Sequence, residues 1–521
     1  MVSPLSSRAR LERMSEPWSL SRIFAMIVTF ALAMVLGAWA ASGEFDYIIL
    51  VAVWFTATMI IIFVQDHWWS PALVISSLGF TTTAMGFRCT GLEIGVFILA
   101  LTFPVKLAMK TLRKAEPEMD AGIIYWALLG YVAIHTIVIL CYNKIELTPS
   151  LKNIVKAYYE CLTPLVFYGL LVRYCHPRTV KPTVVVLFFT TLFTVTLSTI
   201  SLLKGFSGMA FSELRISVDW LDATGATALL RSTAPTLYIG SLAFWPTLRS
   251  DVSRLLVGVG MVVGTIAILV SGGRVPLGIW VAAGIFFAVV RGKLWLAIPI
   301  VVATLLTSAV ITAKPALLYD LPVSVQRTLG PLNFSGQQTE IQQGLQTSDD
   351  WHRNLRERSL TYWTEDTGSF WLGHGYKSWD PTIDLNGNLS AVGYDHLVQI
   401  AVEMGLTENS FSAITNIFGL TGLILYAAFM VSVGVSTFKA LGKCPPRSAA
   451  RALCEFSLVT LVTTLLLFPL AGAVPGMNVV YWGLGLLAAR PYLGAGAKAP
   501  ARKPQVTPLP AFIHSSLRPS A

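Results

Sequence analysis

Two arginines at predicted membrane-surface positions are the residues best suited to bind a charged substrate. Arg274 follows Ser271-Gly272-Gly273 at the junction of two apolar runs, and Arg215 lies in the connection before an earlier run. A guanidinium group matches phosphate geometry with paired hydrogen bonds, and adjacent glycines let a ligand approach the backbone. A single arginine at this depth often only extends its charged head to the membrane surface. Two on one face favour a phosphate clamp. Arg231, inside an apolar run, is a further functional candidate, an ion-pair partner, or a residue outside a span whose boundary is drawn too early.

Further candidates lie in one long polar segment. Arg356 and Arg358 belong to a charged run at 351–358, and His374 lies in LGHGY at 372–376. His396 follows in YDH at 394–396, and Glu408 and Asn409 open ENSF at 408–411. Histidine and carboxylate side chains can act as a general base toward a hydroxyl group. For His374, the flanking glycines favour a turn residue whose ring bonds to backbone atoms.

Motifs of several common chemistries are missing from the sequence. It contains no Walker loop, no GxGxxG, no HExxH and no GxSxG, so nucleotide-driven transport and the usual hydrolase mechanisms lack their required parts. The cysteines form no CxxC pair and no Cys/His spacing typical of a metal site. We therefore expect neither a metal nor a cofactor.

The elements that position these residues are predicted to be membrane-spanning helices. Hydrophobic residues make up 54% of the 521 residues, charged residues only 13%, and the mean hydropathy is +0.64. Soluble proteins carry charge on roughly a quarter of their positions, so this chain has too little polar surface to fold in water. Apolar runs of about 17 to 25 residues can cross a membrane as helices, and about fourteen recur along the chain. They lie at about 23–41, 46–64, 70–87, 91–108, 121–141, 158–173, 181–203, 225–246, 254–271, 275–290, 294–312, 411–436, 452–472 and 476–493.

The basic residues predict the direction in which the helices cross. The net charge is +10, from 38 Lys and Arg against 28 Asp and Glu. Lys and Arg accumulate in the short cytoplasmic loops of membrane proteins. With the N-terminus inside, about 24 of the 38 fall on the predicted cytoplasmic side. The excess charge is thus explained by orientation and not by nucleic acid, and both termini are predicted to be cytoplasmic.

These patterns divide the chain into five parts. Residues 1–22 form a cytoplasmic segment, 23–312 the first eleven helices, 313–410 a large periplasmic loop, 411–493 the last three helices, and 494–521 a disordered cytoplasmic tail. The loop has 98 residues, with twelve Asp and Glu against six Lys and Arg. Helix connections usually have about 2 to 8 residues, so a loop of this length on a rigid scaffold is the natural place for function. The third apolar run, broken by serines, a glycine and threonines, is the least regular; without it every later connection would change sides.

In order and spacing, the motifs resemble those of the O-antigen ligase and polymerase superfamily. The matching features are SGGR at an outer face, an arginine-bearing helix, LGHG, ENSF, and GLTGL about ten residues later. The resemblance covers roughly residues 210–435, and the earlier helices match only in hydropathy.

The resemblance implies an inverting, metal-independent glycosyltransferase with an all-α, GT-C-like membrane fold in the bacterial inner membrane. Such an enzyme takes a glycan from an undecaprenyl-pyrophosphate carrier at the periplasmic face and passes it to a hydroxyl of a glycan or lipid-linked acceptor. By their positions in the motifs, Arg215, Arg274 and Arg356 or Arg358 would hold the pyrophosphate, and His374 and Asn409 would contact substrate. Membrane lipid and polysaccharide assembly proteins are further expected partners.

The sequence departs from the family at the position of its catalytic histidine. Where related enzymes have His before Asn, this chain has Glu408. Glu408 could serve as the general base, His396 could take that role, or substrate positioning alone could suffice. The missing histidine and the predicted fourteen helices favour a polymerase over a ligase.

The competing hypothesis is a multi-pass transporter or flippase of a polar or lipid-linked solute. Such proteins usually show two related halves and polar sites near the middle of the membrane. This chain shows no evident half-repeat, and its candidate residues gather at one face, which favours an enzyme.

Overall fold

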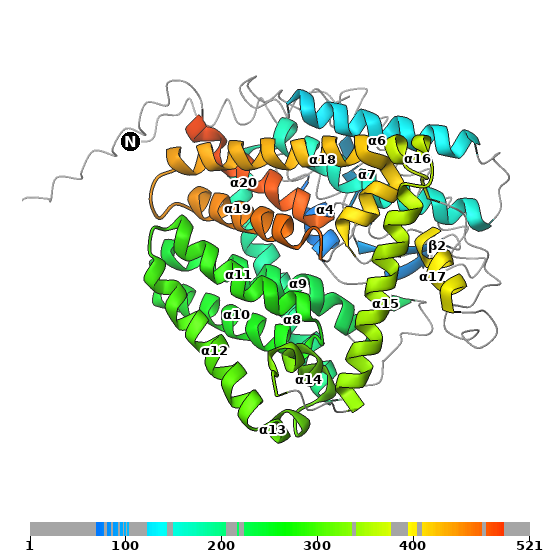
Figure 1. The fold of residues 1–521 in the computed structure, drawn as a ribbon. Coiled ribbons are helices and arrows are strands. Elements are labelled where there is room, and N and C mark those ends of the chain that lie inside the picture. Colours follow the sequence, from blue (N-terminus) through cyan, green and yellow to red (C-terminus); the bar gives the residue numbers. More distant parts are fainter. Residues whose placement is uncertain are drawn as a thin grey trace, which may run out of the picture.

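The computed structural model describes residues 69–77, 81–84, 87–91, 94–96, 98–99, 102–103, 122–142, 149–204, 216–217, 223–335, 340–376, 394–403, 409–470 and 476–493. This part of the chain is a bundle of long helices, and a helix of the large loop stands across one end of it (Figure 1). The long helices are α6 (Ile123–Tyr142), α7 (Pro149–Tyr174), α8 (Val180–Lys204), α9 (Ala223–Phe244), α10 (Asp251–Val270), α11 (Arg274–Val290), α12 (Ile298–Ala313), α18 (Ser410–Lys443), α19 (Ala449–Leu467) and α20 (Met477–Leu493). The other helices are α4 (Ser70–Ser77), α13 (Ala316–Tyr319), α14 (Val323–Leu329), α15 (Glu340–Trp363), α16 (Thr367–Leu372) and α17 (Tyr394–Glu403), with 3-10 turns at Pro177–Thr179, Trp245–Thr247, Leu294–Ala297 and Gly330–Leu332.

The long helices have the character of membrane-spanning segments. In the described part of the chain, five are long and apolar enough to cross a membrane: Ile123–Cys141, Pro177–Leu203, Asp251–Val270, Ser410–Lys443 and Ala449–Leu467. Large apolar side chains stay exposed along them, for example Ile134 on α6 and Phe193 on α8, as expected where lipid replaces water. A helix also satisfies its own backbone hydrogen bonds, which hydrocarbon requires. The chain is therefore a polytopic, predominantly helical membrane protein.

Ten of the predicted spans, from 121–141 to 476–493, each coincide with one long helix. Two of these helices extend well beyond the predicted runs, α7 at its start and α18 at its end. The predicted spans at 23–41 and 46–64 lie outside the described residues, and the span at 91–108 is described only in part. These three predicted spans therefore stay predictions.

The third predicted span, 70–87, is wrong, whereas the described chain as a whole is predominantly helical, as predicted. The structure has the short helix α4 there, followed by the antiparallel strands β1 (Thr81–Ala84) and β2 (Phe87–Thr90). β3 (Ile216–Ser217) pairs with the other edge of β1, which gives the order β2-β1-β3. The reason is local: the threonines at 81–83 are β-branched and favour a strand.

The ends of the long helices gather at two opposite faces of the bundle. At one face, the Phe411 amide at the start of α18 donates to the carbonyl of Phe468, just after α19. At the other, Arg490 near the end of α20 donates to the carbonyl of Cys175, just after α7. We call this second face the basic end and the first the loop end. The described Lys and Arg of the basic end are Arg173, Arg178, Lys181, Arg249, Arg254, Arg291, Lys293, Lys439, Lys443, Arg447, Arg451 and Arg490.

The described carboxylates of the basic end are only Asp251 and Glu455. This excess of positive charge agrees with the predicted cytoplasmic side. From α6 onward, successive connections between the long helices lie alternately at the loop end and the basic end, as predicted for outer and inner connections. This alternation does not depend on whether the third span crosses the membrane.

A buried ion cluster ties three helices together at the basic end. Glu455 of α19 is only 5% exposed, and its Oε2 accepts from Nε and Nη2 of Arg291 at 2.9 and 2.8 Å. Arg291 also donates to the carbonyl of Leu242 in α9 at 2.8 Å, and Arg451 Nε donates to the second oxygen of Glu455 at 3.2 Å. Because both carboxylate oxygens are used, the cluster fixes the ends of α9 and α11 to the start of α19.

We predict that Glu455→Ala strongly destabilises the protein, because it leaves Arg291 and Arg451 without their counter-ion at a mostly buried position. Breaking a buried pair costs about 3–5 kcal/mol, whereas an exposed pair contributes about 0–1 kcal/mol. The exposed Arg254–Asp251 pair at the same end provides the control, Arg254→Ala. The thermal unfolding midpoint in detergent should fall clearly for the first variant and hardly for the second; equal effects would contradict the role of the cluster.

Candidate functional site

The turn between α10 and α11 holds Arg274 in a fixed place at the loop end. Ser271 is fully buried, and its amide donates to the carbonyl of Ala267 at 2.9 Å. Its hydroxyl donates to the Ile268 carbonyl at 2.8 Å. Two glycines then lead to Arg274, which is the first residue of α11. The guanidinium of Arg274 is therefore carried by a short turn between two packed helices.

Two further arginines approach this turn from other helices. Arg231 of α9 donates through Nε to the Ser271 carbonyl at 3.2 Å. Its Cγ lies 3.3 Å from the position that a Cβ on Gly273 would occupy. Arg327 in the last turn of α14 is close enough to Arg231 for their positive charges to repel each other. We call Arg231, Arg274 and Arg327 the arginine cluster.

Two members of the arginine cluster, Arg231 and Arg327, carry unbalanced charge among the described residues. α14 is held close to the turn, since a Cβ on Gly272 would lie 3.6 Å from Ser324. Within the described part, neither Arg231 nor Arg327 forms an ion pair, and both side chains are exposed. Like charges held together favour the binding of an anion, and guanidinium groups match phosphate oxygens well.

Of the predicted arginines, Arg215 lies outside the described residues, directly before β3. Arg356 and Arg358 lie on α15, whose Leu355 and Tyr362 pack on α17 in a small apolar core. Arg358 donates to Oε1 of Gln399 in α17. In Figure 1, α15 extends from α14 to the region of α16, so these two arginines lie on the helix that joins the arginine cluster to the rest of the loop end.

The other predicted site residues lie at the start of α18 and before it. Glu408 lies outside the described residues, and His396 belongs to α17, with its side chain outside the described part. Asn409 caps α18: its Oδ1 accepts from the Ser412 amide at 2.7 Å, and the residue is 3% exposed. An asparagine at this position stabilises a helix start, which gives Asn409 a structural role. Contact between Asn409 and substrate stays a prediction.

The motifs LGHG and GLTGL meet at a break in α18. Gly419 has φ 64° and ψ −169°, which is not helical, and Gly373 has φ 78°. A Cβ on Gly373 would lie 2.4 Å from the carbonyl oxygen of Ile417, and one on Gly419 would lie 2.4 Å from the backbone carbonyl of Trp371. Only glycine fits two backbones this close with positive φ.

Backbone groups freed by this break are bonded by the LGHG segment. The amides of His374 and Gly375 donate to the carbonyls of Asn416 and Ile417 at 2.7 and 3.1 Å. The Phe418 carbonyl accepts from the hydroxyl of Tyr131 on α6 at 2.7 Å. We call these contacts, together with Gly373 and Gly419, the glycine crossing.

His374 serves this crossing through its ring as well. Its Nε2 lies 2.7 Å from the Tyr362 carbonyl, so this nitrogen carries the proton, and the ring stacks on that of Tyr362. These bonds connect α15 to the glycine crossing. They leave Nδ1 as the ring nitrogen available for the predicted substrate contact, which stays a prediction.

Sequence reasoning missed His135, which lies on α6 beneath the crossing. Its Nε2 lies 2.9 Å from the Leu372 carbonyl and its Nδ1 lies 3.2 Å from the Tyr158 hydroxyl. Because a carbonyl only accepts, Nε2 carries the proton and Nδ1 accepts from Tyr158. A single histidine in an apolar helix gives no pattern that would have identified it.

Asp366 caps α16 and holds the Trp371–Gly373 segment in place. Its carboxylate accepts from the Ser369 amide at 2.8 Å and from the Ser369 hydroxyl at 2.7 Å. These hydrogen bonds, that of the amide first, hold the pKa of Asp366 below its ordinary value. The cap is therefore present at neutral pH and is lost only as the pH falls below the ordinary range of aspartate, about 3.9, toward the lowered pKa.

Comparison of the sequence with models of known protein families and with curated proteins finds no match. Among the described residues, no three of His, Cys, Asp and Glu lie together in a way that would hold a metal ion.

We predict that Gly419→Ala releases the LGHG segment from α18, because the new methyl group collides with the Trp371 carbonyl and the backbone is strained. Cys161 reports the change, since its Sγ is buried 3.3 Å from the hydroxyl of Tyr376, the residue after the motif. Maleimide labelling followed by peptide mass mapping should find Cys161 modified in this variant and protected in the parent.

Gly442→Ala in the same helix is the matched control. Its Cβ would meet nothing within 4 Å, and alanine is the better helix former. Protection of Cys161 in both variants would contradict the role of the glycine crossing.

Proposed function

We propose that this protein transfers or polymerises glycan from an undecaprenyl-pyrophosphate-linked donor, at the membrane face that carries the loop end. The observation that carries the proposal is the arginine cluster, in which Arg231, Arg274 and Arg327 come from three helices to one turn. The motif resemblance, which spans both the cluster and the glycine crossing, adds to it. The leading form is a polymerase of a bacterial inner-membrane polysaccharide pathway.

The chemistry requires charge stabilisation more than covalent catalysis. The acceptor oxygen forms a bond to the anomeric carbon, the bond from that carbon to the pyrophosphate oxygen breaks, and the acceptor proton passes to a base. Negative charge grows on the departing pyrophosphate. Fixed guanidinium groups near a membrane stabilise this charge more strongly than water does.

The candidate proton acceptors are Glu408 and His396, and the third alternative is that substrate positioning alone suffices. Glu408 immediately precedes the cap residue of α18, and His396 belongs to α17, which packs against α15. α15 runs from the arginine cluster toward α16. This one helix would therefore hold the donor pyrophosphate and the acceptor hydroxyl in a fixed position relative to each other.

We predict that Arg274→Ala and Arg231→Ala each reduce glycan transfer about 10²- to 10³-fold, the usual loss on removing one stabilising group. The measurement is the length distribution of surface polysaccharide in bacterial cells that depend on the introduced chain. Each variant is checked for equal membrane expression.

Arg353→Ala is the control, because Arg353 is an exposed arginine of the large loop that already pairs with Asp350 at 2.7 Å. It should leave polysaccharide length unchanged. Full-length polysaccharide from the double variant Arg231→Ala/Arg274→Ala would overturn the mechanism. If the chain were a transporter, cells with the variants would accumulate unexported units without loss of polymerase activity in isolated membranes.

The two candidate bases make opposite predictions. If Glu408 accepts the proton, Glu408→Gln abolishes transfer while His396→Ala is tolerated, since the amide keeps the size but cannot accept a proton. The reverse pattern assigns the role to His396. Activity in both variants would leave positioning alone as the source of catalysis.

A further inference from the structure

A large cavity opens at the basic end, on the side of the protein opposite the arginine cluster. Its volume is about 720 Å³, which is within the range of about 300 to 1,000 Å³ typical of ligand sites. It lies between the starts of α8, α10 and α19 and the ends of α9 and α20. The proposed glycosyl transfer does not use this cavity.

The lining of the cavity changes from charged to apolar along α8. Lys181 lies in the first turn, Val184 and Val185 in the next, and Phe188 one turn further, as expected for one face of a helix. Four exposed cations line it: Arg178, Lys181, Arg249 and Arg447. No Asp or Glu is among the described lining residues.

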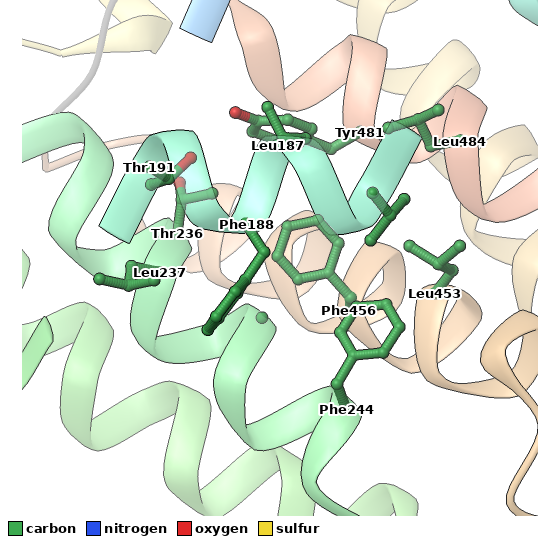
Figure 2. Close-up of a pocket in the computed structure, with 12 residues that line it drawn as sticks. Leu187, Phe188, Thr191, Thr236, Leu237, Phe244, Leu453, Phe456, Tyr481 and Leu484 are labelled. Carbon is green, nitrogen blue, oxygen red and sulfur yellow. The ribbon is translucent and has the colours of Figure 1, made fainter. Parts of the chain in front are cut away.

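A smaller apolar pocket of about 50 Å³ continues the cavity toward the middle of the bundle. The two share Val184, Phe188, Phe244 and Leu453. Figure 2 shows Phe188, Phe244 and Phe456 gathered between α8, α9 and α19, with Leu484 of α20 beside them. The walls are almost wholly hydrocarbon at this depth, so a water-soluble ion would gain nothing from them.

The four cations have no counter-charge in the described part of the chain. None of them forms an ion pair there, and the nearby Asp251 pairs with Arg254 instead. Arg447 also holds a left-handed backbone, φ 59°, in the turn after Pro445 and Pro446. Non-glycine residues seldom adopt this conformation, and where they do it is often at ligand sites.

We propose that this cavity binds an anionic phospholipid from the leaflet at the basic end, with its phosphate among the four cations and an acyl chain along α8 and α9. Charge complementarity and the apolar continuation point to the same ligand. Basic residues near a membrane surface attract anionic lipids, whereas a choline headgroup adds its own positive charge and would be disfavoured.

The test is native mass spectrometry of the full chain in detergent, titrated with dioleoylphosphatidylglycerol or dioleoylphosphatidylcholine. We expect the parent to bind phosphatidylglycerol at least about tenfold more tightly. Arg249→Gln/Arg447→Gly should remove this preference. Both positions lie outside the long helices, and glycine adopts the left-handed backbone of Arg447 readily, so the fold is preserved.

Lys439→Gln/Lys443→Gln is the control, since it removes equal charge from the same end but does not touch the cavity. This control variant should still bind phosphatidylglycerol more tightly than phosphatidylcholine. Equal binding of the two lipids by the parent, or an equal loss of preference in both double variants, would overturn the proposal.

A filling variant tests the acyl chain separately from the headgroup. A Cβ on Gly240 would meet only Phe456, at 3.8 Å, so Gly240→Leu fits the helix and projects into the apolar pocket. Gly240→Leu should weaken the binding of dioleoylphosphatidylglycerol, whose long acyl chain needs the pocket, and leave the binding of the short-chain dihexanoylphosphatidylglycerol unchanged. Unchanged binding of the long-chain lipid, or displacement of it by millimolar inorganic phosphate, would show that a soluble phosphate is the ligand and would overturn the lipid assignment.

Discussion

The break at Gly419 leaves carbonyl groups of α18 without partners in their own helix, and a membrane environment does not tolerate unbonded backbone groups. The amides of His374 and Gly375 and the hydroxyl of Tyr131 bond these carbonyls, so the break and the docked segment require each other. The positions of the neighbouring loop-end helices depend on these hydrogen bonds. α16 is held in place because it leads into the docked segment, and α15 is held because the His374 ring bonds to its Tyr362 carbonyl. The described parts α15 and α16 of this long loop are therefore fixed on the bundle.

The two ends of the bundle use arginine in opposite ways. At the basic end, Arg291 and Arg451 share Glu455, and the charge is neutralised where helices must pack. At the loop end, Arg231 and Arg327 repel each other and have no carboxylate partner among the described residues. Charge kept unpaired near a membrane costs free energy, and such a cost is expected where a ligand supplies the missing charge. The contrast supports the proposal that the arginine cluster binds an anion, because the structural arginines of the same bundle are paired with a carboxylate.

Hydropathy was sufficient to predict most of the helices, because spans such as α10 and α19 are determined by the length of their apolar runs. It failed at 70–87, where β-branched threonines form a strand paired with residues of a distant segment. At the site, Arg231 and Arg274 could be identified from their unusual depth. Arg327 could not, because only tertiary packing brings α14 to the turn. The motifs LGHG and GLTGL were recognisable, and the prediction that the His374 ring bonds to backbone atoms is confirmed. The contact between the two motifs and the capping role of Asn409 depend on backbone geometry that no spacing encodes.

α9 links the features of the two ends. It carries Arg231 at the loop end, while Gly240 and Phe244 line the apolar pocket and cavity at the basic end. α9 packs against α8, α10, α11 and α19, and the Arg291–Glu455 cluster bonds to its last turn. A phospholipid between α8, α9 and α19 would fill space that packed side chains leave open, and so would restrain the same helix that positions Arg231. The arginine cluster is thus held by two supports far from it, an ion cluster made by the chain itself and, as proposed, a lipid supplied by the membrane.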